Sequence, residues 1–212
     1  LISVENSTNL GGGKIWPVEN LAGLRELANE HGIKMHMDGA RLMNAVVGSG
    51  VPANEFASYV DTVWIDLTKG LGAPVGAVIA GPTDFIEEAR LWKHRLGGAM
   101  RQAGVIAAAG LYAFEHNVER LAEDHANAKF LEAEIGKIPG VRLVNGPVET
   151  NILFFSVAET GRSITDVTQR MREQGVRMAP YAATNVIRAV THLDVTRAES
   201  ERATEALRET VA

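Results

Sequence analysis

The chain has 212 residues, of which 46% are hydrophobic and 22% charged, with a net charge of −5 and no cysteine. This composition is ordinary for a globular protein of one or two domains with a sizeable core. The acidic balance argues against a nucleic-acid partner, which needs a basic face. The lack of cysteine excludes disulfides and thiolate metal sites and fits a reducing, cytoplasmic location. No apolar run approaches the roughly 20 residues of a membrane helix.

The N-terminus shows no initiator Met and no signal-peptide pattern, but begins Leu1-Ile-Ser-Val. Such a start is typical of a strand entered in the middle of a fold. We therefore expect the chain to be the C-terminal portion of a longer protein.

Strand and helix patterns alternate in the first half of the chain. Residues 1–4 predict a strand, and residues 5–13, rich in Asn, Ser and Gly, predict a loop. Pro17 and the following leucines predict a helix that ends at Gly32. Further elements are expected at residues 33–37 (strand), 54–59 (short helix), 63–65 (strand) and 74–80 (strand). This order predicts an α/β fold, a mixed, mostly parallel sheet with flanking helices.

The second half begins with helices. Thr83 or Asp84 is expected to cap a helix that ends near Leu96, and a long helical stretch from Arg101 to about Lys137, bent near residues 116–117, follows. Shorter elements are then expected at residues 141–145, 151–157, 176–179 and 186–191 (strands) and 163–174 and 196–211 (helices), the last with a Thr196–Glu199 capping box. We predict an incomplete large domain over residues 1–115. Residues 116–212 are expected to form a connecting helix and a small α+β domain.

Charged residues follow two of the predicted strands. Lys69 comes after an apolar strand and next to Gly70, which permits close approach of backbone or ligand. Asp38 and Arg41 come after the preceding strand, and ligands of α/β sheets bind beyond the carboxyl ends of the strands. A Schiff-base lysine and an aspartate that pairs with a protonated pyridine nitrogen are what pyridoxal phosphate requires. An exposed lysine after a strand is the alternative interpretation.

Five segments closely resemble, in the same order, successive motifs of the low-specificity L-threonine aldolases, which belong to the β-eliminating lyase group of pyridoxal-phosphate enzymes with the aspartate-aminotransferase fold. The segments are residues 5–13 (ENSTNLGGG), 36–41 (HMDGAR), 68–76 (TKGLGAPVG), 97–104 (GGAMRQAG) and 188–194 (RAVTHLD). Each motif alone is weak, but five in register are specific, and the resemblance covers essentially the whole chain.

The resemblance implies roles for individual residues. Lys69 matches the lysine that binds pyridoxal 5'-phosphate, Asp38 the partner of the pyridine nitrogen, and Arg41 the arginine beside the ring oxygen. Arg188 matches the arginine that binds the substrate carboxylate; an ordinary strand-end arginine is the alternative. The implied reaction cleaves L-threonine or L-allo-threonine, which are β-hydroxy-α-amino acids, to glycine and acetaldehyde. The full-length form is expected to be a homodimer or homotetramer.

The chain departs from the family pattern in lacking the N-terminal portion, with its phosphate-binding glycine turn, and in carrying Thr8 where histidine is common and Thr68 where serine is usual. We therefore expect weak or absent activity from these 212 residues unless a partner chain supplies the missing parts. Two alternatives stay open: a related pyridoxal-phosphate β-elimination lyase or aminotransferase, and a non-catalytic truncated chain.

The histidines give no metal site. His36 and Asp38 share one face of a strand, but two ligands do not make a site. His192 is expected to be a hydrogen-bonded structural residue rather than a substrate contact. His31, His116 and His125 fall in helical stretches and are expected at the surface.

Overall fold

A computed structural model of the chain describes residues 1–181 and 185–212. The chain folds into two compact units. Unit 1 contains Leu1–Ser7 and Ile15–Leu121, and unit 2 contains Thr8–Lys14 and Ala122–Ala212. The sequence predicts a single division between residues 115 and 116. The two units instead divide six residues later, and a loop near the N-terminus belongs to unit 2.

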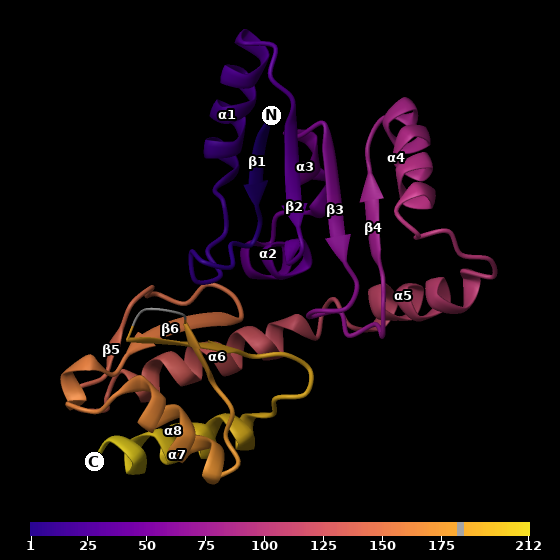
Figure 1. The fold of residues 1–212 in the computed structure, drawn as a ribbon. Coiled ribbons are helices and arrows are strands. Elements are labelled where there is room, and N and C mark those ends of the chain that lie inside the picture. The colour runs from indigo at the N-terminus through magenta and orange to yellow at the C-terminus, as the bar shows by residue number, and fades with distance from the viewer. Residues whose placement is uncertain (182–184) are drawn as a thin grey trace. The chain divides into compact units, whose positions relative to one another are not determined.

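Unit 1 is built on a four-stranded sheet in the order β1-β2-β3-β4 (Figure 1). Its strands are β1 (Ile2–Glu5), β2 (Met35–Gly39), β3 (Thr62–Asp66) and β4 (Ala77–Ala80). The first three strands are parallel, and β4 runs antiparallel to β3. The prediction of a mixed, mostly parallel sheet is therefore confirmed.

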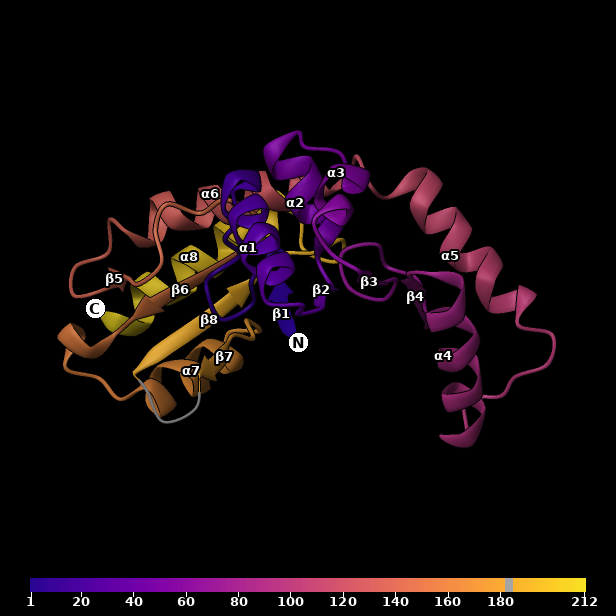
Figure 2. The same cartoon turned by 90° about the horizontal axis from the view of Figure 1, so that it is seen from above.

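Three helices of unit 1 gather on one side of this sheet, as Figure 2 shows. They are α1 (Val18–Glu30), α2 (Leu42–Ser49) and α3 (Ala53–Ser58). Val4, Met37 and Val63 on the strands, together with Leu21 of α1 and Phe56 of α3, belong to one buried apolar cluster. Side chains of a strand alternate between its faces, so the residues between these buried positions face the other side.

Two helices of unit 1 differ from the sequence prediction. The helix α2 was not predicted, because its first four residues are all buried and so show no alternation of apolar and polar positions. These residues are Leu42, Met43, Asn44 and Ala45. The helix α4 (Thr83–Arg95) begins after Pro82, which has no side-chain hydrogen bond to cap it, so the predicted caps at Thr83 and Asp84 are wrong.

The predicted long helical stretch is interrupted. It forms α5 (Gly104–His116) and α6 (Leu121–Ile135), and the break begins next to the predicted bend. Asn117, which follows α5, donates a hydrogen bond from Nδ2 to the carbonyl oxygen of Leu71 at 2.7 Å. This bond anchors the chain in unit 1 at the point where the helix ends.

Unit 2 contains an antiparallel sheet in the order β5-β6-β8-β7. Its elements are β5 (Arg142–Leu143), β6 (Ile152–Ser156), a 3-10 turn (Ala158–Thr160), α7 (Ile164–Glu173), β7 (Ala179–Tyr181), β8 (Val186–Val190) and α8 (Arg197–Val211). Phe155, Ile187 and Leu207 lie in its apolar core with residues of α6 and α7. The α+β character is confirmed, and so is the capping box, in which Thr196 and Glu199 bond each other's backbone N–H. The strand predicted at residues 176–179 lies instead at β7.

Within residues 1–181 and 185–212, no helix is both long enough and apolar enough to cross a membrane.

Candidate active site

Lys69 lies in the turn that follows β3, and Asp66 organises that turn. Its Oδ1 accepts hydrogen bonds from the backbone N–H of Thr68 at 2.7 Å and from the Thr68 hydroxyl at 2.6 Å. The turn closes when the N–H of Gly72 donates to the carbonyl oxygen of Lys69 at 3.0 Å. An aspartate that bonds the backbone two residues ahead is a common way to fix a turn, and here it fixes the residue before the lysine.

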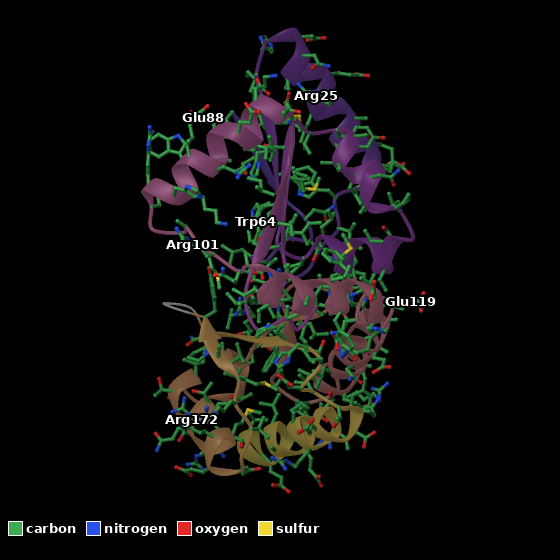
Figure 3. The ribbon with its side chains drawn as sticks, turned by 90° about the vertical axis from the view of Figure 1, so that its right-hand side faces the viewer. Arg25, Trp64, Glu88, Arg101, Glu119 and Arg172 are labelled. Carbon is green, nitrogen blue, oxygen red and sulfur yellow. The ribbon has the colours of Figure 1, made fainter. Side chains whose placement is uncertain are left out.

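The amine of Lys69 is held over the sheet by two contacts. Its Nζ lies 3.0 Å from Asp66 Oδ2, and 5.3 Å from the centre of the Trp64 ring, which is labelled in Figure 3. The lysine side chain is 38% exposed and that of Asp66 only 14%. Burial alone would raise the pKa of Asp66, but hydrogen bonds from Thr68 and Lys69 outweigh it and hold that pKa below its usual value. A fixed, accessible amine therefore faces an ionised carboxylate.

Gly70, next to Lys69, is required by close packing. A Cβ at this position would lie 2.7 Å from Leu121 Cδ2 and 3.2 Å from Asn44 Oδ1. Only a residue without a side chain lets the backbone come this near its neighbours. The expectation that glycine permits close approach beside Lys69 is confirmed, with protein atoms as the neighbours.

Asp38 and Arg41 lie at the carboxyl end of β2, the strand next to β3. Asp38 is the register partner of Trp64, and its Oδ1 accepts a hydrogen bond from the N–H of Ala40 at 3.0 Å. Arg41 directly precedes α2 and lines a small cavity of about 10 Å³ together with Asp66. The structure thus brings the ends of both strands together, as the sheet topology predicts. The roles of Lys69, Asp38 and Arg41 toward a cofactor remain predictions.

Arg188 belongs to unit 2, where it lies in the middle of β8. Its Nη1 donates a hydrogen bond to Asn9 Oδ1 at 2.7 Å. Its register partners are Phe154 on β6 and Ala179 on β7. Within the described part of the chain, no carboxylate forms an ion pair with this guanidinium. It also lines a cavity of about 360 Å³. Its role toward a substrate remains a prediction.

Sequence reasoning did not identify three residues that contact Lys69 or Arg188: Trp64, Asp66 and Asn9. The spacing of Asp66 and Thr68 is that of a side-chain-to-backbone turn and could have identified Asp66. The position of Trp64 beneath the Lys69 amine could have been predicted only from the register of the strands. No local signal identifies Asn9, because its contact with Arg188 joins residues 179 positions apart.

The histidines are explained by structural contacts. His36 Nδ1 lies 2.7 Å from the hydroxyl of Thr62, and His192 Nδ1 accepts a hydrogen bond from the N–H of Asp194 at 3.3 Å. The expectation that His125 lies at the surface is wrong, since it is 5% exposed. Its burial, followed by the charge of Lys129, lowers the pKa of His125 to about 4. In the described ranges, no group of three His, Cys, Asp or Glu residues could hold a metal ion.

Comparison with known proteins gives a consistent result. A model of the family described as β-eliminating lyase matches residues 1–160. Low-specificity L-threonine aldolase 1 of Arabidopsis thaliana is 38% identical over 196 residues, which are 92% of this chain and 55% of that protein. The chain thus spans about half the length of this relative.

Solved structures share the fold. The threonine aldolase of Leishmania major superposes with a TM-score of 0.77 at 22% identity, covering 99% of this chain and 60% of the other. A PLP-dependent aminotransferase from Streptococcus suis superposes with a TM-score of 0.77 at 17% identity, covering 99% of this chain and 56% of the other. At these identities the likeness establishes that the chain shares the fold of these two structures.

Proposed function

The chain belongs to the β-eliminating lyase family, and from this premise we propose that it performs the pyridoxal-phosphate-dependent aldol cleavage of L-threonine and L-allo-threonine. The products are glycine and acetaldehyde. The observation that carries the proposal is the fixed amine of Lys69 at the carboxyl end of β3, beside the carboxyl end of β2 with Asp38 and Arg41. The name of the Arabidopsis relative supports the substrate class.

The residues of unit 1 fit pyridoxal phosphate by their chemistry. Lys69 offers an amine for covalent attachment, Asp38 a carboxylate for the pyridine nitrogen, and Arg41 a guanidinium for the ring oxygen. Asp38 lies on the sheet face opposite the buried cluster, and the residues beside it on this face are only half-buried, so a planar ring can reach it. When bound, the cofactor withdraws electrons from the substrate Cα.

The chain's own residues then have three tasks in the reaction. Arg188 binds the substrate carboxylate, because a guanidinium and a carboxylate form two parallel hydrogen bonds. Asp66 holds the Lys69 amine at a fixed place above the sheet. Asp38 would pair its carboxylate with the protonated pyridine nitrogen of the bound cofactor. The Cα–Cβ bond breaks and its electron pair stays on Cα. The β-hydroxyl loses its proton, so its oxygen becomes the carbonyl oxygen of acetaldehyde, and Cα takes up a proton to give glycine.

A homodimer or homotetramer of the full-length form is part of the proposal. Large apolar side chains are exposed on the edge strand and outer helices of unit 1, including Ile79 of β4, Trp92 of α4, and Val105, Leu111 and Tyr112 of α5. Patches of this kind mark interfaces. Sedimentation velocity tests this part, and a monomer at micromolar concentration would contradict it. A cytoplasmic location also remains a proposal.

A second candidate activity is β-elimination, the reaction that the description of the matching family names. The experiment that separates the two measures acetaldehyde released from L-threonine and L-allo-threonine, and pyruvate released from L-serine, by the chain and by any longer product of its gene. We expect acetaldehyde to be the dominant product, with weak or absent release by the 212 residues alone, and we expect Lys69→Ala to abolish any release. Dominant pyruvate, or acetaldehyde release that survives Lys69→Ala, would refute the proposed function.

A further inference from the structure

We propose that Asn9 is a positioning residue for Arg188: its amide oxygen holds the guanidinium in place for a small α-amino carboxylate and leaves the positive charge uncancelled. The inference rests on the proposed function, in which Arg188 binds the substrate carboxylate. It adds a residue from the N-terminal loop to that task.

The contact between the two side chains is direct. Arg188 Nη1 donates to Asn9 Oδ1 at 2.7 Å in a partly buried setting. A guanidinium has five N–H donors, so one bond to Asn9 leaves enough donors for a carboxylate. On the sheet, the register partners Phe154 and Ala179 flank Arg188 on both sides. Phe154 is itself buried and packs edge-on against Tyr181 at 5.7 Å. Fixed apolar neighbours limit where the arginine side chain can go.

The loop that carries Asn9 is closed by its own backbone. The N–H of Thr8 donates to the carbonyl oxygen of Lys14 at 2.9 Å, and the N–H of Gly13 donates to that of Thr8 at 2.8 Å. The carbonyl oxygen of Asn9 accepts from the N–H of Gly12 at 3.2 Å. These bonds use only backbone atoms of the loop. They would form with other side chains at position 9, so they do not explain why that position carries an amide.

The same loop is fixed to unit 2 at its far end. The hydroxyl of Thr150 donates to the carbonyl oxygen of Gly13 at 2.7 Å in a buried position. The Nζ of Lys14 donates to Pro147 O at 2.6 Å and to Glu149 Oε1 at 2.9 Å. Gly13 has a φ of 73°, and a Cβ there would lie 2.4 Å from the Thr150 hydroxyl oxygen. A loop held this tightly presents Asn9 at a defined place.

The amide, rather than a carboxylate, is the informative feature. An aspartate at position 9 would have the same shape and would also accept from Arg188, but it would form an ion pair and compete with any incoming carboxylate. An amide oxygen orients the guanidinium and stays neutral. Arg188 then keeps its full attraction for a ligand carboxylate beside the buried Phe154, where charges are less screened than in water.

The test measures the reactivity of Arg188 in the 212-residue chain without cofactor. Phenylglyoxal modifies accessible arginines, and mass spectrometry of peptides gives the rate at Arg188 relative to Arg172, an exposed arginine of the same unit (Figure 3). Each rate is measured alone, with glycine, and with glycinamide, which lacks the carboxylate. The variants are Asn9→Ala and the isosteric Asn9→Asp. The matched control is Thr8→Val, which removes a hydroxyl of the same loop that bonds Lys14 O rather than Arg188.

In the unchanged chain we expect glycine, and not glycinamide, to slow the modification of Arg188. Asn9→Ala should raise the relative rate about tenfold and weaken glycine protection by a similar factor, the size expected for one hydrogen bond to a charged group. Asn9→Asp should keep the slow rate but lose the protection, a split that a merely structural role would not produce. Thr8→Val should behave like the unchanged chain.

Three results would overturn the inference: an unchanged rate in Asn9→Ala, full glycine protection in Asn9→Asp, or equal protection by glycinamide. The proposed function can fail separately. The chain could release no acetaldehyde from threonine while the modification rate of Arg188 still depends on Asn9 and glycine still protects Arg188. In that case the proposed reaction is wrong, but the positioning of Arg188 by Asn9 stands.

Discussion

Asp66 should stabilise unit 1 mainly by fixing the turn before Lys69. The carboxylate accepts two hydrogen bonds from Thr68 and pairs with the Lys69 amine, with 14% of its side chain exposed. At about 1.5 kcal/mol for each bond to a charged acceptor, Asp66→Ala should lower the free energy of unfolding by about 3 kcal/mol. Asp66→Asn can still accept from Thr68, and should cost only about 1 kcal/mol.

Urea unfolding followed by tryptophan fluorescence measures this effect. The three tryptophans, Trp16, Trp64 and Trp92, all lie in unit 1, so the signal reports on that unit. Because the pKa of Asp66 is lowered in the fold, its contribution is present above the ordinary value of 3.8 and is lost as the pH falls through the lower folded pKa. The gap between the unchanged chain and Asp66→Ala should therefore close in acid.

The exposed Glu87 of the same unit supplies the control, and Glu87→Gln should leave the unfolding midpoint unchanged. Ordinary surface substitutions change the free energy of unfolding by less than about 0.5 kcal/mol, and losses this small for both Asp66 substitutions would refute the reasoning. A gap between the unchanged chain and Asp66→Ala that stays constant from pH 7 to pH 2 would refute it as well.

Three more outcomes are expected. The pKa of His125 is about 4 in the fold, so the unfolded chain binds more protons than the folded chain between pH 6.5 and 4. Unit 2 should therefore lose stability as the pH falls through that range, and hydrogen exchange should show a smaller loss in His125→Gln. Arg188→Ala should raise KM for threonine more than tenfold, and Arg188→Lys should not restore it. Gly12 has a φ of 78°, and a Cβ there would lie 2.5 Å from Asn145 Cβ, so Gly12→Ala should lower the melting temperature of unit 2. An unchanged melting temperature would show that the alanine is not strained at this position.

The strands and the placement of the candidate cofactor residues could be predicted because their signals are local. An apolar run that ends in polar residues gave β3 with Lys69 beyond it, and the alternation of strands and helices gave β2 as a parallel neighbour with Asp38 at the same edge. Helix α2 could not be predicted, because its buried face includes the polar Asn44 next to three apolar residues.

The misplaced His125 has a related cause. Helix α6 buries the polar residues Asp124, His125 and Asn127, and two hydrogen bonds join this stretch to a segment far along the chain. The Asp124 carbonyl oxygen accepts from the Thr191 hydroxyl at 2.6 Å, and Asn127 Nδ2 donates to Val195 O at 3.1 Å. Hydrophobic periodicity cannot report burial that is compensated in this way. The pairing of Asn9 with Arg188 was hidden for the same reason.

The identity of the lysine that carries the cofactor is the central claim, and one measurement tests it directly. The chain is incubated with pyridoxal phosphate, the adduct is fixed by borohydride reduction, and the modified peptide is identified by mass spectrometry. We expect a single major site at Lys69, no label there in Lys69→Ala, and reduced labelling in Asp66→Ala. Labelling spread evenly over the surface lysines, with Lys69 no more reactive than Lys34, would contradict the assignment of this site.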